Sequence, residues 1–472
     1  MASPSRTIGP GRVVVDNIHG SIELSDLEWN VVNTASFQRL RWLKQLGMGH
    51  LTYPNATHNR FAHSLGVFGI MRRITDLLSR QNPGIDEYDL QNLRLAALLH
   101  DIGHYPYSHL MERVERVTLT EEEVCRDEKR TLSTEKEAYP DHETLGRHIV
   151  GHQSDLIKAI GSEKRAQEIG ALFSRTEAAH PQLSKLIHSS LDMDRLDYLL
   201  RDARATGVPY GEIDINYLLN NIRISPEGVI GVEYKALAAA EHFLLARLFM
   251  HRTVYFHKTT YALEEACRQP LRRIRDTGKY EMHEDGRQIL NYCSGPTLSD
   301  FTDDFVDRII RKATQDENPV INTLANCITN RKPPKLLKEV SGLQEKGKPR
   351  LDSVFRTNCR FRLSALADKF NLPVGQFLLC GPKPIKIEER GPLFTRDEAK
   401  KLETEEREEL IKVFVPGEEE PRSIVEINDC LIRLLSGHQF GICRLYLADD
   451  GPEADARFKK IQAEVSTWTE DQ

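Results

Sequence analysis

An apolar helical run that ends in imidazole and acidic side chains constrains this chain more than any other feature. Residues 98–109 read LLHDIGHYPYSH, and the preceding residues continue the run of Leu and Ala. His100 and Asp101 end a packed helix in groups whose burial is costly unless they are paired or bind a metal. Adjacent residues point about 100° apart around a helix, so both reach one ion only if it lies at the helix end. The stretch therefore predicts a metal site that takes further ligands from other helices.

Two other side chains are candidate ligands by their type and position. His63 lies on the first turn of a helix predicted over 60–80, and Asp194 lies in the acid-rich segment LDMDRLD. Imidazole and carboxylate ligands suit Zn, Fe, Mn and similar divalent ions. A lone histidine is more often a hydrogen-bonded structural residue than a ligand, so His63 alone carries little weight. The H-D pair followed by His104 and His109 is harder to explain by packing.

The composition is that of a globular protein, and it excludes several classes. The chain has 472 residues, 40% of them hydrophobic, and a net charge of −6, which gives no general attraction to nucleic acid or anionic membranes. No apolar run approaches the roughly 20 residues of a transmembrane helix, and the N-terminal segment MASPSRTIGPGR lacks the apolar part of a signal peptide. Eight scattered cysteines favour reduced thiols. We therefore expect a cytoplasmic protein with no membrane attachment.

Periodicity and turn residues predict a mainly α protein with a short N-terminal β-hairpin and a smaller C-terminal α+β lobe. The hairpin is predicted at 12–24, and helices at 34–47, 60–80, 141–152, 184–204 and 234–268. Strands with Gly/Pro turns are predicted within 375–389, 411–428 and 441–449. The charged stretch 112–140 reads as a mobile insertion and the basic stretch 331–350 as a solvated linker. We expect two domains, at 1–330 and 331–472.

The helix predicted over 234–268 carries a second chemical signal. Arg247, His251, Tyr255 and Lys258 lie 4, 4 and 3 residues apart, so on a straight helix of about three turns they form one stripe. A stripe of cationic side chains with one tyrosine suits a polyanionic ligand: Arg or Lys would contact phosphate oxygens, and Tyr would pack against a sugar or a base. The usual alternative for such a stripe is a solvated cationic face.

Three blocks of this sequence, HNRFAHSLGV, LLHDIGHYPYSH and DMDRLDYLLRD, resemble successive motifs of the HD-domain phosphohydrolase superfamily. With SFQRLRWLKQLG and MHRTVYFHK, the chain more closely resembles the deoxynucleoside triphosphate triphosphohydrolases related to the sterile-alpha-motif and HD-domain protein. The resemblance covers about 12–270 and begins almost at the N-terminus, so we expect no sterile-alpha-motif domain. It implies a helical HD fold and hydrolysis of dNTPs to deoxynucleoside and inorganic triphosphate.

The resemblance also implies roles for individual residues near the metal. One divalent ion, with Mn, Mg, Fe, Co and Zn left open, would be held by His63, His100, Asp101 and Asp194. The acid/base and orienting groups beside the α-phosphate would be His104, His109, His142 and Glu143. Where the family often has Asp after the second motif histidine, this chain has Glu112.

The substrate contacts implied by the resemblance come from four helices and loops. Arg60 and Arg195 would contact phosphates, Gln45 and Asp202 the sugar 3′-hydroxyl, and Leu46 the base edge. Tyr255 would lie under the deoxyribose and exclude a 2′-hydroxyl. The remaining members of the implied substrate set are Tyr198, Arg247 and His251.

Nucleotide regulation is a point where this chain departs from the family. Members that need an activator are implied to bind it between subunits, through an Asn in the first hairpin and an Asp before the FQRLR helix. Here those positions are Val15, which cannot hydrogen-bond through its side chain, and Asn33, which lacks the charge. Gln38 and Arg41 match that site but equally suit a solvated helix face. We expect a homo-oligomer, dimer or tetramer, whose activity does not require GTP.

Two other functions stay open at this point. The metal site is shared across the superfamily, so the substrate of the enzyme is either a dNTP or another nucleotide or phosphate ester. In a different class, the chain is a nucleotide-sensing or nucleic-acid-binding regulatory protein, with the basic stretches 331–350 and 356–362 as a weak nucleic-acid surface. Steep salt dependence of binding would indicate the latter.

Overall fold

The computed structural model describes most of this chain. The described residues are 12–81, 85–112, 114, 138–173, 186–187, 191–225, 229–382, 384–386 and 410–468. Most of the insertion predicted over 112–140 lies outside them.

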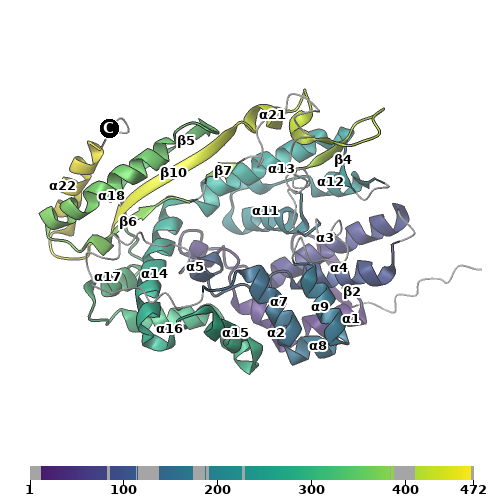
Figure 1. Ribbon diagram of the computed structural model, residues 1–472, viewed down its shortest axis with the longest axis horizontal. Coiled ribbons are helices and arrows are strands. Elements are labelled where there is room, and N and C mark those ends of the chain that lie inside the picture. The colour runs from purple at the N-terminus through teal and green to yellow at the C-terminus, as the bar shows by residue number, and fades with distance from the viewer. Residues whose placement is uncertain are drawn as a thin grey trace, which may run out of the picture.

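Helices dominate the described structure (Figure 1), which confirms the mainly α fold. The N-terminal half contains α1 (Asp26–Val32), α2 (Ala35–Gln38), α3 (Arg60–Gln81), α4 (Glu87–Leu99), α5 (His109–Glu112), α7 (His142–His152), α8 (Ser154–Ile160), α9 (Glu163–Ala171), α11 (Met193–Thr206) and α12 (Ile215–Asn220). The remainder contains α13 (Leu237–Met250), α14 (Lys258–Thr277), α15 (Gly286–Ser294), α16 (Asp303–Ala313), α17 (Pro319–Thr329), α18 (Leu351–Phe370), α21 (Leu431–Leu435) and α22 (Ala454–Ser466).

The strands form three small sheets. They are β1 (Arg12–Asp16), β2 (Gly20–Leu24), β3 (Ile222–Ile224), β4 (Ile230–Glu233), β5 (Lys335–Glu345), β6 (Phe377–Cys380), β7 (Ile385–Lys386), β8 (Lys412–Phe414), β9 (Arg422–Ser423) and β10 (His438–Leu447). The predicted N-terminal hairpin is confirmed, because β1 pairs with β2 in antiparallel register from Arg12↔Leu24 to Asp16↔Gly20. Gly20 has a φ of +73°, a conformation that glycine adopts without steric cost.

The helices around the site are held by a continuous apolar core. On α3, Leu65, Phe68 and Ile74 are buried at the spacing of one helical face, and α4 contributes Leu95 and Leu98 to the same core. The α3 helix packs against both α4 and α11. This packing fixes three helices whose polar residues face one another.

The helix predicted over 34–47 is much shorter than expected. α2 ends at Gln38, a 3₁₀ turn covers 39–42, and Leu43 is extended with φ −113° and ψ 113°. The chain then pairs with the segment before α3: the amide of Gln45 donates to the carbonyl of His58, and the amide of Arg60 to that of Leu43. This pairing competes with continued helix and brings Gln45 beside α3.

The single helix predicted over 234–268 is also wrong. α13 ends at Met250, a π-helical turn covers His251–Tyr255, and α14 begins at Lys258 after an extended residue, His257. The stripe of cations is therefore interrupted before Lys258, which is exposed. Single π-turns inside helices are common at functional sites.

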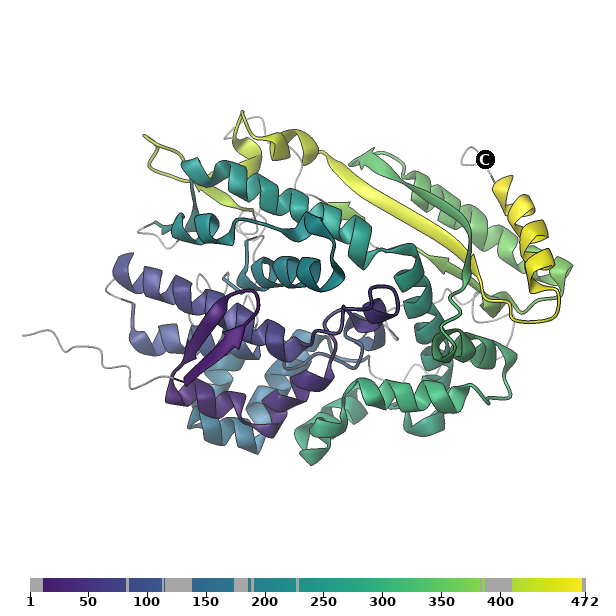
Figure 2. The ribbon, with the colours of Figure 1, turned by 180° about the vertical axis from the view of Figure 1, so that it is seen from behind.

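The C-terminal part contains a sheet in the order β5-β10-β6, with β7 also paired to β10. α18 packs against β5, β6 and β10, and α22 packs against β5 (Figures 1 and 2). The linker predicted at 331–350 is wrong, because β5 pairs with β10 along nearly its whole length. Leu337 and Val340 of β5 are buried, so this segment is part of the lobe's core.

A second connection ties the C-terminal part to the helical core. β8 pairs in parallel with β4, in a sheet of order β3-β4-β8-β9. The division into domains at 330 stays a prediction. Among the described helices, none combines the length and hydropathy that a bilayer crossing requires.

Candidate functional site

The four predicted metal ligands lie together where α3, α4 and α11 meet. His63 is on the first turn of α3, Asp194 on the first turn of α11, and His100 and Asp101 directly follow the last residue of α4. Nε2 of His63 lies 2.9 Å from Oδ1 of Asp194 and 3.6 Å from Oδ2 of Asp101. Nε2 of His100 lies 3.3 Å from Oδ1 of Asp101 and 3.8 Å from Oδ1 of Asp194. The adjacent His100 and Asp101 converge because the helix has ended there.

The donor set fits a divalent ion. The Nε2 atoms of His63 and His100 are both buried, and neither makes a hydrogen bond of acceptable geometry within the described part of the chain. Each of these histidines uses Nδ1 elsewhere: His63 contacts Asp197 at 2.7 Å, and His100 contacts the carbonyl of Ala97 at 2.8 Å. His63, His100 and Asp101 each offer a ligand atom within 4.8 Å of the others, and Oδ1 of Asp194 lies within 3.8 Å of both Nε2 atoms. Two imidazoles and two carboxylates are a ligand set for Zn, Fe, Mn or a similar ion.

The electrostatics of this cluster favour positive charge. Burial opposes a charge on His63, but the close carboxylates of Asp194 and Asp197 outweigh burial and raise its pKa to about 10. Burial likewise opposes ionisation of Asp194, yet His100 and His63 hold its pKa below the ordinary value. Ionised carboxylates that stabilise a positive charge on His63 are equally suited to stabilise a metal cation.

Arg60 connects the metal cluster to the adjoining pocket. Its guanidinium contacts Oδ2 of Asp101 through Nη1 and Oγ of Ser108 through Nε and Nη2, at 3.0 and 2.7 Å for the latter two. The side chain is only 5% exposed. Burial opposes ionisation of Asp101, whereas Arg60 and the neighbouring His100 hold its pKa well below the ordinary range. Asp101 is therefore an anion that both Arg60 and an ion can share.

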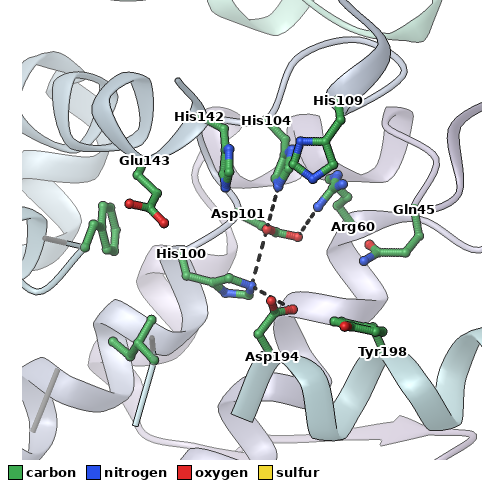
Figure 3. Close-up of a pocket in the computed structure, with 12 residues that line it drawn as sticks. Gln45, Arg60, His100, Asp101, His104, His109, His142, Glu143, Asp194 and Tyr198 are labelled. Carbon is green, nitrogen blue, oxygen red and sulfur yellow. Dashed lines mark hydrogen bonds and ion pairs between the residues drawn. The ribbon is translucent and has the colours of Figure 1, made fainter. Parts of the chain in front are cut away.

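Three histidines form a second group beside Asp101 (Figure 3). The rings of His104 and His142 stack at 4.3 Å, and His109 lies 5.2 Å from each, edge to face. Nε2 of His104 is 3.0 Å from Oδ1 of Asp101, which links the two groups. Burial and the charge of Arg60 hold the pKa of His104 well below 6.5, so its ring is neutral near pH 7.

Glu112 organises this second group. Its side chain is 2% exposed, and its oxygens lie 2.6 Å from Nδ1 of His109 and 3.2 Å from Nδ1 of His142. The same carboxylate accepts the backbone amide of His142, the first residue of α7, at 3.3 Å. Burial lowers the pKa of His142, but the hydrogen bond that its ring donates to Glu112 outweighs burial and raises that pKa. Glu112 thus serves both histidines, where the sequence left its role open.

A cavity of about 190 Å³ joins the two groups. Its lining comprises Gln45, Arg60, His100, Asp101, His104, His109, His142, Glu143, Phe173, Ile187, Asp194 and Tyr198. Figure 3 shows the three histidines on one side of Asp101, with His100 and Asp194 on the other. All predicted acid/base residues and three of the four predicted ligands therefore border one space, with the buried His63 behind it.

The predicted sugar-reading residues Asp202 and Tyr255 are in direct contact. The Tyr255 hydroxyl donates to Oδ2 of Asp202 at 2.8 Å, and Nε2 of His58 lies 2.7 Å from the other oxygen. The ring of Tyr198 stands edge to face against Tyr255 at 5.9 Å. Oε1 of Gln45 is buried without a hydrogen-bond partner in the described structure. The pair Asp202 and Tyr255 continues the site along α11, away from the metal cluster.

The remaining predicted substrate residues lie nearby but outside the cavity lining. Arg195 contacts Asp192 at 3.1 Å, and Arg247 donates to the carbonyl of Lys386 at 3.2 Å. Burial lowers the pKa of His251 to about 3, with Arg247 and Arg195 adding to the effect, so this ring is neutral. Its Nδ1 is buried without a partner among the described atoms.

Leu46 is the last of the predicted substrate residues. It packs partly buried on the core beside the 3₁₀ turn Gly47–Leu51.

Sequence reasoning missed four residues that hold the site in place. These are Arg39, His58, Asp197 and Arg201. Arg39 is buried and donates to the carbonyls of Ile102 and His104, which fixes the loop after the H-D pair. The spacing of Asp197 from Asp194 by three, and of Arg201 from Asp197 by four, puts them on one face of α11, a signal that was present in the sequence. No local signal marks Arg39 or His58, because their partners lie far away in the chain.

Comparison with known protein families identifies the domain. Residues 60–202 match the model of the HD domain, and residues 213–293 match the HD associated region. The chain carries an HD domain. The matched stretch begins at Arg60 and ends at Asp202, so all four predicted metal ligands lie within it.

Several relatives share this part of the chain. The uncharacterized protein YwfO of Bacillus subtilis is 32% identical over 289 residues, 61% of this chain and 60% of that protein. The uncharacterized protein MJ1154 of Methanocaldococcus jannaschii is 33% identical over 258 residues, 52% and 46% of the two chains. The human deoxynucleoside triphosphate triphosphohydrolase SAMHD1 is 44% identical over 103 residues, 21% and 16% of the two. The alignments thus span about half of the length of the first two relatives and a sixth of SAMHD1.

Solved structures share the fold over nearly the whole chain. A phosphohydrolase from Bacteroides thetaiotaomicron superposes with a TM-score of 0.67 at 20% identity, covering 92% of this chain and 99% of that one. A hypothetical protein from Aquifex aeolicus superposes with a TM-score of 0.66 at 22% identity, covering 96% and 100%. The likeness includes the C-terminal part, where the matches to the HD domain and HD associated region have ended.

Proposed function

We propose that this protein is a metal-dependent phosphohydrolase that converts dNTPs to deoxynucleoside and inorganic triphosphate. One observation carries the proposal. On one side, the carboxylate of Asp101 faces Nε2 of His63 and Nε2 of His100, two buried nitrogens that make no hydrogen bond in the described structure. On its other side lies a pocket lined by His104 and Arg60. A site of this kind holds a cation next to an anion.

The residues of the pocket suit a phosphate ester. Arg60 supplies positive charge to phosphate oxygens, and His142, whose pKa is raised, also lines the pocket, while Asp101 on the other side faces the metal position. A bound divalent ion would polarise the phosphoryl oxygen and lower the pKa of a bound water. His109 uses Nδ1 for its bond to Glu112, so it exchanges a proton with substrate through Nε2. The half-exposed ring of His109 suits contact with a leaving group that departs into solvent.

The deoxyribose preference rests on Asp202 and Tyr255. Asp202 is 2% exposed, and its two oxygens are engaged by His58 and Tyr255, which holds the carboxylate and the phenol ring in a fixed relative position. A fixed ring excludes an additional hydroxyl more strongly than a mobile one. The 44% identity to SAMHD1 over 103 residues supports a nucleotide substrate of the same class.

The contacts of the basic stretch 331–350 weaken the alternative that this protein is a nucleic-acid-binding regulator. Within 331–350, Lys335 contacts Asp455 and Arg350 contacts Asp352. Cations that already pair with carboxylates of the lobe release fewer counterions on binding nucleic acid. This pairing favours the enzyme over a nucleic-acid-binding module.

The test is product analysis on a panel of nucleotides. Purified protein is incubated with dNTPs, NTPs and dNMPs in the presence of Mn, Mg, Fe, Co or Zn, and products are separated by chromatography, with Asp101→Asn as the negative control. We expect deoxynucleoside and intact triphosphate from dNTPs. Orthophosphate or pyrophosphate as the first product would favour a phosphohydrolase of another ester, and absence of turnover with steep salt-dependent nucleic-acid binding would favour the regulatory alternative.

A further inference from the structure

The N-terminal hairpin contacts the metal cluster through one buried carboxylate. We propose that His19, at the turn of the hairpin, acts through Asp197 as a positioning residue for the metal ligand His63, and so helps to set the affinity for the ion. The inference rests on the metal site of the proposed function. It gives the hairpin a role that the match to the HD domain, which begins only at Arg60, does not include.

Asp197 receives hydrogen bonds from three directions. Its Oδ2 lies 2.7 Å from Nδ1 of His63 and its Oδ1 lies 2.6 Å from Nε2 of His19. Arg201, one turn further along α11, donates Nε to Oδ2 and Nη2 to Oδ1, at 2.7 and 2.8 Å. Asp197 and His63 have no exposed side-chain surface, and His19 is 7% exposed. This carboxylate is therefore fixed by residues of α3, of α11 and of the hairpin.

The hairpin is shaped to make this contact. Oδ1 of Asp16 accepts the backbone amides of Ile18 and His19 at 2.9 Å each, which closes the turn. Oδ2 of Asp16 accepts Nη1 of Arg201, also at 2.9 Å. The turn thus presents an imidazole and a carboxylate to α11 side by side.

Gly66 provides the space that the contact needs. It lies on α3 one turn after His63, and a Cβ placed there would stand 1.9 Å from Oδ1 of Asp197 and 2.4 Å from Nη2 of Arg201. Any side chain at this position would push Asp197 away from α3. The backbone of α3 is therefore open at the point where Asp197 approaches it.

The consequence for the metal follows from the chemistry of imidazole. A carboxylate that accepts Nδ1–H fixes the orientation of the His63 ring, so that Nε2 faces Asp101 and Asp194 and is the nitrogen that gives up its proton to a metal ion. Loss of such supporting contacts typically costs about 10- to 100-fold in metal affinity. Without His19, Oδ1 of Asp197 keeps only the bond from Arg201, and the carboxylate can rotate away from His63.

The alternative is that His19 merely attaches the hairpin to the helices. The chain offers a control for this, because Glu23 of β2 also attaches the hairpin to α3, through Arg72 at 2.6 Å, far from Asp197. That pair is partly exposed, with Glu23 59% and Arg72 23% exposed. Glu23→Gln weakens this attachment by removing its charge, while the backbone carbonyl of Glu23 still accepts from Arg72, and it leaves Asp197 untouched. His19→Leu removes the contact to Asp197.

The experiment measures Co²⁺ binding to the full-length, chelator-stripped protein by its visible absorption, which also reports coordination geometry. We expect His19→Leu to weaken binding about tenfold or more and to change the spectrum, and Glu23→Gln to match the wild type. His19→Gln retains an N–H donor near the position of Nε2 and should restore most of the affinity. In the wild type, Co²⁺ should slow amide hydrogen exchange at the turn 16–20, a readout that does not depend on the folding of any variant.

The outcomes separate this inference from the proposed function. A wild type that binds no Co²⁺ overturns the metal site itself. A wild type that binds Co²⁺, with His19→Leu equal to Glu23→Gln in affinity and spectrum, overturns only the role of His19. Unchanged exchange at the turn on Co²⁺ binding also overturns it.

Discussion

The hydroxyl of Tyr255 donates a hydrogen bond of 2.8 Å to Asp202, across the space between the π-helical turn and α11. The family resemblance implies that the ring of Tyr255 fills the 2′ side of the sugar and that the carboxylate of Asp202 binds the 3′-hydroxyl. The hydrogen bond joins these two groups. Burial and the charge of Asp202 hold the pKa of the phenol well above its ordinary value, so Tyr255 stays a donor. The ring and the hydroxyl therefore have separable roles.

Replacing Tyr255 tests the steric role of its ring. Tyr255→Ala should relax discrimination against ribonucleotides by about tenfold or more, because it opens the space beside the sugar. Tyr255→Phe keeps the ring and should retain discrimination while it lowers kcat/KM for both substrates, since Asp202 loses a donor. The measurement is kcat/KM for dGTP and for GTP with each variant. A ratio unchanged in Tyr255→Ala would remove this residue from sugar selection.

Removing Asp101 should abolish both metal content and turnover. Within the described part of the chain, Asp101 is the one carboxylate that faces His63, His100 and His104 together. Asp101→Ala is expected to lose stoichiometric metal in elemental analysis and to keep a helical circular dichroism spectrum. Asp304→Asn, on the exposed face of α16, is the matched carboxylate control. Unchanged metal content in Asp101→Ala would contradict the ligand assignment.

Glu112 gives a prediction about pH. Burial opposes its ionisation, but His109 and His142 hold its pKa well below the ordinary 4.5, and Glu112 raises the pKa of His142 above 6.5. The depressed carboxyl pKa contributes stability above about pH 4.5 that is lost as pH falls through the folded value. The raised imidazole pKa contributes stability below about pH 6.5 that is lost as pH rises through the folded value. The contact between Glu112 and His142 therefore stabilises the fold most between about pH 4.5 and about pH 6.5.

Glu112→Gln removes this coupling. We expect it to lower the free energy of unfolding by about 2 kcal/mol near pH 5.5, with a smaller difference at pH 8 and above. The measurement is denaturant unfolding of both proteins from pH 5 to pH 9. Asp304→Asn, on the exposed face of α16 and away from both histidines, is the control and should show no such pH dependence. A difference that grows with rising pH would contradict the raised pKa of His142.

The sequence was sufficient to predict the proximity of the residues that lie on regular helices or directly at their ends. His63 and Asp194 lie on the first turns of α3 and α11, and His100 and Asp101 directly follow α4. The apolar faces of these three helices are periodic, so the four residues converge once the helices pack. The hairpin was equally predictable, since alternation and the turn at Asn17–Gly20 define it locally.

The parts that could not be predicted depend on contacts between distant segments. The helix does not continue after Gln38, because the backbones of Leu43 and Gln45 pair with the segment before α3. Local helix propensity does not reveal such a pairing. The break after Tyr255 is stabilised by the C-terminal lobe, where Arg444 donates to the carbonyl of Phe256 at 2.6 Å. That partner lies 188 residues away, so periodicity alone favoured one straight helix.

The last prediction concerns Asn33, the position where the resemblance implies an Asp that binds the guanine of a nucleotide activator. The side-chain amide of Asn33 donates to the carbonyl of Trp29 at 2.7 Å, and Gln38 donates to that of Val32 at 2.7 Å. Arg41 in turn donates to Oε1 of Gln38 at 2.7 Å and lies 3.5 Å from the ring centroid of Phe61. Side chains that satisfy one another locally must break these bonds before they contact a nucleotide, which lowers the affinity of such a site.

We therefore expect hydrolysis of dATP that does not require GTP, in an oligomer whose mass does not change when GTP is added. Val15 is 81% exposed on the hairpin and offers no polar group to an activator, which agrees with this expectation. The measurement is dATP turnover with and without GTP, alongside light scattering for mass. Asn33→Asp restores the charge that the family uses at this position, and a gain of GTP stimulation in that variant would show that the missing charge is the cause. A strict GTP requirement in the wild type would show instead that Asn33 reads guanine as an amide, because the amide retains an acceptor oxygen.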